Sequence, residues 1–202
     1  MSSKTSFSRQ GEQLWAKMPK ANTELFALTY GAIVSEIVRD SSSAADADAR
    51  LDAMGFSIGV RLIDEYCAKA SLVAGAGGAC RTLQEAAQAV AKVGFKMFLG
   101  VSCDVAPFPP DGRSFSLILY DNPLTTFVEL PEREEADGAV DLSQMCFSNV
   151  YCGVIRGALE QVNLKVKCTF VRDVLKGDDV NEILVELKEV MADGAGEEYQ
   201  EE

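Results

Sequence analysis

Cysteine is the residue type best suited to covalent chemistry in this 202-residue sequence, because the chain contains no histidine. Without histidine, a single chain cannot form a Ser-His-Asp triad, a Cys-His pair or a histidine-ligated metal site. The six cysteines contain no Cys-x-x-Cys spacing, which argues against a thioredoxin-like redox site or a zinc knuckle. We therefore predict no catalytic residue, no metal and no cofactor. With no secretory signal, we expect reduced thiols, five of which pack as small apolar side chains: Cys67, Cys103, Cys146, Cys152 and Cys168.

Cys80 differs from these five because it follows a glycine-rich loop, residues 75–79, and precedes an expected helix over residues 82–99. The loop is a poor candidate for phosphate binding. A Walker loop needs glycine and lysine where Cys80 and Arg81 stand, and a dinucleotide loop needs glycine at position 80 and a preceding strand.

The helix after Cys80 has one apolar face. At 100° per residue, that face holds Leu83, Ala87, Val90, Gly94, Met97 and Phe98, whereas polar and charged residues fall on the other side. Two interpretations stay open at this point. The face packs into an ordinary core, or its small residues leave room beside the helix for an apolar ligand.

The remaining sequence predicts the elements that position this helix. Apolar residues make up 48% of the chain, enough for a core. Phe26, Tyr30, Ile33 and Ile37 recur at helical spacing, after a cap at Asn22 or Thr23. Gly55 and Gly59 suggest close helix approach. The expected order is helices over 23–39, 45–70 and 82–99, a hairpin of strands 114–120 and 125–130, a helix over 142–163, and strands 164–173 and 181–189.

This order predicts the α+β class, with a helical layer packed on a small antiparallel β-sheet. We expect a flexible N-terminal arm over residues 1–20, one domain over 21–191 and an acidic disordered tail over 192–202. The net charge of −12 argues against nucleic acid as a partner. The longest uncharged stretch near the middle of the chain, residues 142–155, is too short for a bilayer span, which needs about 20 apolar residues.

Eight segments, in order along the chain, carry a family resemblance. They are ELFALTYGA (24–32), MGFSIGVRLI (54–63), AKVGFKMFLG (91–100), FSLIL (115–119), NPL (122–124), FVELP (127–131), CGVIRGALE (152–160) and LKGD (175–178). Together they resemble the Bet-three family, the core small subunits of the transport protein particle (TRAPP) tethering complex.

This resemblance implies a Bet-three-like α+β fold and a scaffold rather than an enzyme. Family members dimerise through helices, here with another small TRAPP subunit or, when isolated, with a second copy. Their complex acts as a guanine-nucleotide exchange factor for a Rab-one/Ypt-one type GTPase in ER-to-Golgi and Golgi traffic. The resemblance therefore places the chain in the cytoplasm, peripheral on cis-Golgi and endoplasmic reticulum membranes.

The family also has an internal apolar channel and a cysteine that carries a palmitoyl-type chain as a thioester. These features map onto Cys80 and the helix over residues 82–99. The physical chemistry agrees, because a helix N-terminus favours a thiolate. Cys80 and Gly94 are also separated by roughly 21 Å of helix, the reach of such a chain. The family often has arginine just before this cysteine, where Ala79 stands here.

A membrane-facing basic patch is a second implied feature, carried by Arg61, Arg81, Lys92 and Lys96. An ordinary mixed surface explains these charges equally well. An alternative function is a stand-alone acyl- or lipid-binding module of the same fold. An acyl-transfer or hydrolytic enzyme is disfavoured by the missing histidine.

Overall fold

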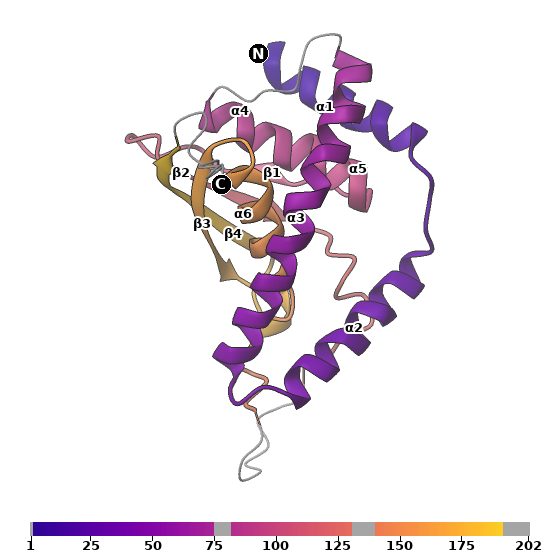
Figure 1. The fold of residues 1–202 in the computed structure, drawn as a ribbon, viewed down its shortest axis with the longest axis vertical. Helices are drawn as coiled ribbons and strands as arrows, with labels where there is room; N and C mark the ends of the chain where they lie inside the picture. Colours follow the sequence, from indigo (N-terminus) through magenta and orange to yellow (C-terminus); the bar gives the residue numbers. More distant parts are fainter. Residues whose placement is uncertain (1, 75–81, 131–139, 192–202) are drawn as a thin grey trace, which may run out of the picture.

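The computed structural model describes residues 2–74, 82–130 and 140–191, in which helices pack on a four-stranded antiparallel sheet (Figure 1). This arrangement confirms the predicted α+β class. The elements are α1 (Ser2–Lys17), α2 (Thr23–Arg39), α3 (Ala44–Ala74), α4 (Leu83–Gln88), the π-helical turn η1 (Ala89–Gly94), α5 (Phe95–Leu99), β1 (Asp104–Val105), β2 (Ser114–Leu119), α6 (Val150–Glu160), β3 (Leu164–Arg172), the 3-10 turn η2 (Val174–Lys176) and β4 (Asn181–Val190).

The sheet has the strand order β1-β2-β4-β3. Phe115 pairs with Val185 and Leu117 with Ile183, and all four side chains are buried. The predicted hairpin between residues 114–120 and 125–130 is wrong, because the second segment forms turns and β2 pairs with β1 and β4 instead. Asn122 stabilises those turns, since its side-chain oxygen accepts the Leu124 N–H at 3.1 Å.

The helix expected over residues 142–163 is shorter in the structure. Residues 142–149 form successive turns, and α6 begins only at Val150. The two C-terminal strands and the helices over residues 23–39 and 45–70 are confirmed to within a few residues. Asn22 caps α2 as expected, because its side-chain oxygen accepts the Leu25 N–H at 2.7 Å.

Helices α3 and α6 pack with their backbones in contact, and α6 also packs against β3. A Cβ added to Gly55 or Gly59 would lie closer than 3.0 Å to a backbone oxygen of α6. A Cβ added to Gly153 or Gly157 would meet a backbone oxygen of α3 in the same way. The close helix approach predicted from Gly55 and Gly59 is therefore confirmed, and α6 contributes a matching pair.

The N-terminal segment is not the flexible arm expected from its polar sequence. Residues 2–17 form α1, which packs against α3, η1 and α5 (Figure 1). Leu14 is buried in a small cluster with Val93 and Met97, and Gly11 lets the α1 backbone approach the Lys92 carbonyl. The apolar contacts of α1 are few and widely spaced, so its sequence carries only a weak helical signal.

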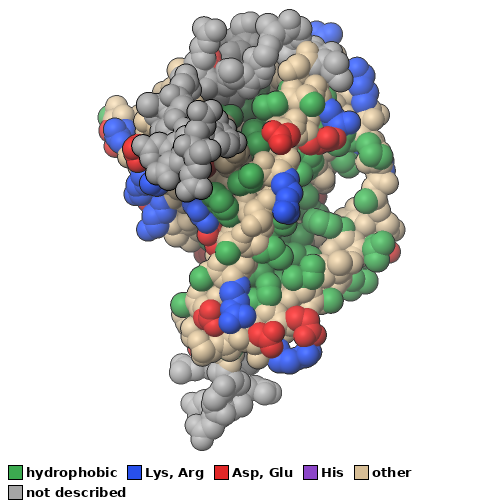
Figure 2. All heavy atoms as spheres, viewed as in Figure 1, with side chains coloured by type: hydrophobic (Ala, Val, Ile, Leu, Met, Phe, Trp, Pro, Cys, Tyr) green, Lys and Arg blue, Asp and Glu red, His purple; other side chains and the backbone are tan. Residues whose placement is uncertain are grey.

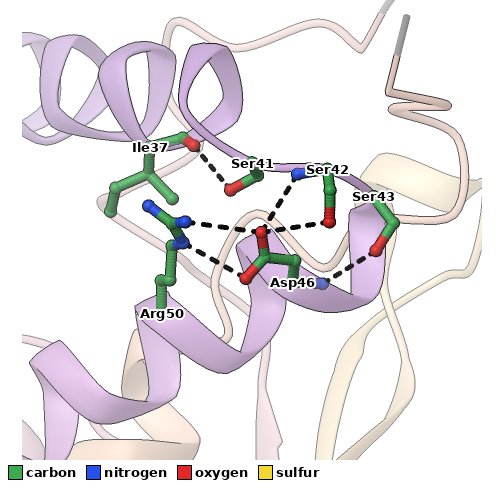
Figure 3. A network of polar contacts seen from close by, with 6 residues as sticks. All are labelled: Ile37, Ser41, Ser42, Ser43, Asp46 and Arg50. Atoms are coloured by element: carbon green, nitrogen blue, oxygen red, sulfur yellow. Dashed lines mark hydrogen bonds and ion pairs between the residues drawn. The ribbon is translucent and has the colours of Figure 1, made fainter. Parts of the chain in front are cut away.

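A polar network joins the end of α2 to the start of α3 (Figure 3). Asp46 accepts hydrogen bonds from the Ser42 backbone N–H at 3.0 Å and from Arg50 Nε at 3.2 Å. These contacts lower the pKa of Asp46, the Ser42 N–H bond most strongly. Ser41 Oγ also donates to the Ile37 carbonyl at 2.6 Å. The network fixes the connection that sets α2 beside α3.

Candidate functional site

The segment that follows Cys80 is not one regular α-helix. It starts at Thr82, whose hydroxyl accepts the Glu85 N–H at 3.1 Å, and it ends at Gly100 in the left-handed region with φ +76°. Between α4 and α5, η1 has π-helical hydrogen bonding: the Phe95 N–H donates to the Val90 carbonyl, five residues back. The Ala91 carbonyl accepts the Cys103 N–H at 3.1 Å, outside the helix.

The π turn separates the predicted apolar face into two parts. A π turn inserts an extra residue, which rotates the following turn relative to a regular α-helix. Leu83 and Ala87 are buried in the main core, and Val90 packs against it. Met97 and Phe98 instead pack with Leu14 of α1. Five of the six predicted lining residues therefore divide between two apolar clusters, whereas the prediction assumed 100° per residue and a single face.

Gly94 ends the π turn, and a Cβ would fit there without a clash. A Cβ added there would meet nothing closer than the Ala89 carbonyl oxygen at 3.8 Å. This property suits the role that the sequence analysis gave Gly94, a position that leaves room next to the helix. Cys80, the predicted acyl acceptor, lies outside the described residues, as does Arg81.

The predicted basic residues differ in their surroundings. Lys92 forms an ion pair with Asp104 at 2.7 Å and Lys96 with Glu12 of α1 at 3.0 Å, and these lysine side chains are only 20% and 18% exposed. Arg61 is exposed. Two of the four predicted charges are thus neutralised within the chain, so among the described residues only Arg61 remains as an open basic candidate.

The described cysteines are all free thiols. Burial raises the pKa of Cys103, Cys146 and Cys152 well above the usual range, so these thiols stay neutral and pack as small apolar groups. No cluster of three or more potential metal ligands occurs within residues 2–74, 82–130 and 140–191. Among the helices of those ranges, none combines the length and apolar character needed to cross a bilayer.

The outer face of α2 is a second candidate site, which the sequence analysis did not identify. It exposes Leu25, Phe26, Leu28 and Ile33, and we refer to these four residues as the α2 face. Figure 2 shows hydrophobic side chains gathered over α2 and in the space between α2 and α3. Exposed apolar patches of this kind mark protein interaction sites.

A groove of about 510 Å³ continues this apolar surface, and we call it the α2 groove. One wall is α2, including Leu28 and Gly31, and the other includes Phe127, Met145 and Phe147. The Tyr30 hydroxyl donates to the Phe147 carbonyl at 2.6 Å, which holds the two walls together.

The sequence did hold a signal for this surface. Apolar residues surround α2 more widely than one buried stripe requires, and a helix that is apolar on several sides needs a second partner. The helical spacing alone was misleading, because Phe26 and Ile33 belong to the exposed face whereas Ala27, Tyr30 and Val34 are buried.

Comparison with known proteins identifies one family. The family model "Transport protein particle (TRAPP) component" matches residues 26–186. Trafficking protein particle complex subunit 3 of Dictyostelium discoideum is 42% identical over 187 residues, which cover 93% of this chain and 94% of the relative. Subunit BET3 of Saccharomyces cerevisiae is 36% identical, covering 93% of this chain and 92% of the relative.

A solved structure is also similar. It is a crystal structure of trafficking protein particle complex subunit 3 from Naegleria fowleri, covalently bound to palmitic acid. The two chains share 42% identity with a TM-score of 0.75, and the match covers 85% of this chain and 98% of the other.

Proposed function

Because this chain belongs to the transport protein particle (TRAPP) component family, we propose that it is a non-enzymatic scaffold subunit of a TRAPP vesicle-tethering complex in ER-to-Golgi and Golgi traffic. The observation that carries the proposal is the match, over nearly the full length of both chains, to subunit 3 of Dictyostelium discoideum. In this proposal the chain works in the cytoplasm, peripheral on cis-Golgi and endoplasmic reticulum membranes.

The proposal assigns the α2 face and the α2 groove to pairing with another small TRAPP subunit. Burying apolar side chains such as Leu25 and Leu28, which are 67% and 60% exposed, would contribute about 25 cal/mol for each Å² removed from water. A second copy of the chain takes this place when partners are absent. Guanine-nucleotide exchange on a Rab-one/Ypt-one type GTPase is then a property of the assembled complex, to which this chain contributes its fold.

The proposal also assigns an acyl thioester to Cys80. The thiolate attacks the carbonyl carbon of an acyl thioester donor, the new S–C bond forms at Cys80, and the donor thiolate leaves. The acyl chain then follows α4 towards Gly94, where the absence of a side chain would let it approach the helix backbone. Each buried CH₂ group stabilises the fold by about 0.8 kcal/mol. The palmitic acid bound to the Naegleria fowleri relative supports this assignment.

Two measurements test the proposal separately. Intact mass spectrometry should find an acyl increment on the purified wild type that hydroxylamine removes and that Cys80→Ser lacks. An unmodified wild type, or a modified Cys80→Ser variant, would contradict the thioester. Co-purification should recover other small TRAPP subunits and a Rab GTPase. A homodimer that ignores them would favour the stand-alone acyl-binding module instead.

A further inference from the structure

A cavity of about 370 Å³ lies where the start of α3, the turn before α6 and the end of β3 meet, and we call it the α3–β3 cavity. It is separate from both the 83–99 segment and the α2 groove. Its lining brings together three carboxylates and two basic groups: Asp48, Asp173, Asp178, Arg172 and Lys176.

Asp173 is the most buried of these residues, with 4% of its surface exposed. Its position is fixed, because its N–H donates to Asp178 Oδ2 at 2.7 Å and its Oδ1 accepts the Leu175 N–H at 3.0 Å. Its second oxygen, Oδ2, is buried and has no hydrogen-bond partner among the described residues. A buried carboxylate oxygen without a partner costs free energy, which a nearby cation would offset.

Asp48 brings a second carboxylate to the same cavity. Its Oδ1 accepts the Cys146 N–H at 2.9 Å, and its backbone carbonyl accepts Asn149 Nδ2 at 2.8 Å. Burial raises the pKa of Asp48 and the negative charge of Asp173 adds to this, although the Cys146 N–H and Lys176 act in the opposite direction. The cavity therefore holds two hydrogen-bonded carboxylates, the buried Asp173 and the partly buried Asp48, and the negative charge of Asp173 disfavours that of Asp48.

The two basic groups that line the cavity make their direct polar contacts with residues other than Asp48 and Asp173. Arg172 faces Glu182 at 3.7 Å, and the exposed Lys176 donates to the Gln144 carbonyl at 3.1 Å. Cys146 and Cys168 also line the cavity, but burial raises the pKa of both thiols, so neither supplies charge or a nucleophile. Lys176 therefore acts on the Asp48 carboxylate without an ion pair, and among the described residues no basic group forms an ion pair with Asp48 or Asp173, which leaves these two carboxylates available to a further cation.

The rim of the cavity points to a protein as the source of that cation. Val171 lines the cavity and Val174 is close by in η2, and these side chains are 48% and 43% exposed. Val171 lies at the end of β3, an edge strand of the sheet, and Val174 follows it in η2. Exposed apolar groups beside a small charged site are typical of protein interfaces, in which arginine is enriched.

We propose that the α3–β3 cavity receives an arginine side chain of a partner protein. A planar guanidinium presents several donors at once and is easier to desolvate than an ammonium group, which suits a pair of fixed carboxylates better than lysine does. The site needs neither the acyl chain nor the α2 face, so it adds a second interaction surface to the scaffold.

The test uses the full chain with Cys80→Ser, labelled with ¹⁵N, so that acylation does not affect the outcome. The probe is acetyl-Gly-Arg-Gly-amide, and its neutral control has citrulline in place of arginine. NMR titration should shift the amides of Asp48, Cys146 and Asp173 with the arginine peptide only. Asp48→Asn and Asp173→Asn should each weaken binding by about tenfold, the effect of losing a hydrogen bond to a charged group.

Glu65→Gln is the matched control, because it removes an exposed negative charge of α3 that pairs with Lys69 outside the cavity. It should leave the titration unchanged. Equal responses to both peptides, shifts confined to other parts of the chain, or full binding by both Asn variants would overturn the proposal. Thermal melting establishes that each variant folds. If a cavity variant does not fold, the comparison of the arginine and citrulline peptides still tests the proposal, because it uses the chain without a cavity substitution.

Discussion

Glycine has opposite effects in two regions of this molecule. Between α3 and α6, Gly55 and Gly153 lie so close to the facing backbone that no Cβ fits. At Gly94, after the π turn, the nearest atom to an added Cβ is the Ala89 carbonyl oxygen at 3.8 Å. In the first region glycine lets two backbones touch, and in the second a Cβ would make only an ordinary van der Waals contact.

The sequence context separates the two cases. The packed glycines of α3 and α6 come as pairs four residues apart, Gly55 with Gly59 and Gly153 with Gly157, so each pair lies on one side of its helix. Gly94 has no such partner at that spacing. The paired glycines therefore mark the α3–α6 contact, whereas a single glycine has no fixed meaning: Gly11 also meets a facing backbone, and Gly94 does not.

The largest effect expected from this comparison is that of Gly153→Ala. Its Cβ would lie closer than 3.0 Å to the Asp52 carbonyl oxygen, a backbone atom that cannot rotate away. Separating α3 from α6 should cost about 3 kcal/mol in the free energy of unfolding, even though alanine favours the helix by about 1 kcal/mol. Urea denaturation of the isolated chain measures this loss. A stability equal to that of the wild type would show that the two helices are not held at backbone contact.

A smaller loss is expected for Gly11→Ala in α1. Its Cβ would meet the Lys92 carbonyl, so α1 should move away from η1 and α5. Because α1 packs through a small cluster around Leu14, we expect the free energy of local unfolding of α1 to fall by about 1–2 kcal/mol. Hydrogen exchange of α1 amides should accelerate while exchange in β2 and β4 stays slow. Equal acceleration in the sheet would mean that α1 unfolds together with the core.

These two regions also show which features of the fold could be predicted from the sequence. The motifs identified the TRAPP family, which the comparisons confirm, and the paired glycines indicated the helix contact at Gly55 and Gly59. The π turn could not be predicted from apolar spacing, which assumes a constant angle per residue, and the turn occurs together with a long-range hydrogen bond from the Cys103 N–H to the Ala91 carbonyl. The strand expected over 125–130 does not form. Asn122 accepts hydrogen bonds from the Leu124 and Thr125 N–H groups, and these turns direct the chain away from β2.

Gly94→Leu tests the second region of the comparison, at the end of the π turn. The Cβ would meet nothing closer than the Ala89 carbonyl oxygen at 3.8 Å, so we expect the free energy of unfolding to change by less than about 1 kcal/mol in a Cys80→Ser background. With Cys80 present, the same variant should lose the acyl increment in intact mass spectrometry, because the leucine occupies the space that the proposal gives to the chain. Gly94→Ala is the control that should keep the increment. Full acylation of Gly94→Leu would place the chain elsewhere.

The smallest effect is expected at Gly31, which lies in α2 with nothing within 4 Å of an added Cβ. Gly31→Ala should stabilise the isolated chain by about 0.5 kcal/mol, because alanine restricts the unfolded chain and favours the helix. Gly31 lines the α2 groove, however, so the added methyl group should weaken pairing with a small TRAPP subunit in co-purification. A stabilised chain that pairs less well would assign Gly31 to the interface. A stabilised chain that pairs normally would leave the α2 groove outside the contact, since the methyl group would then meet only solvent.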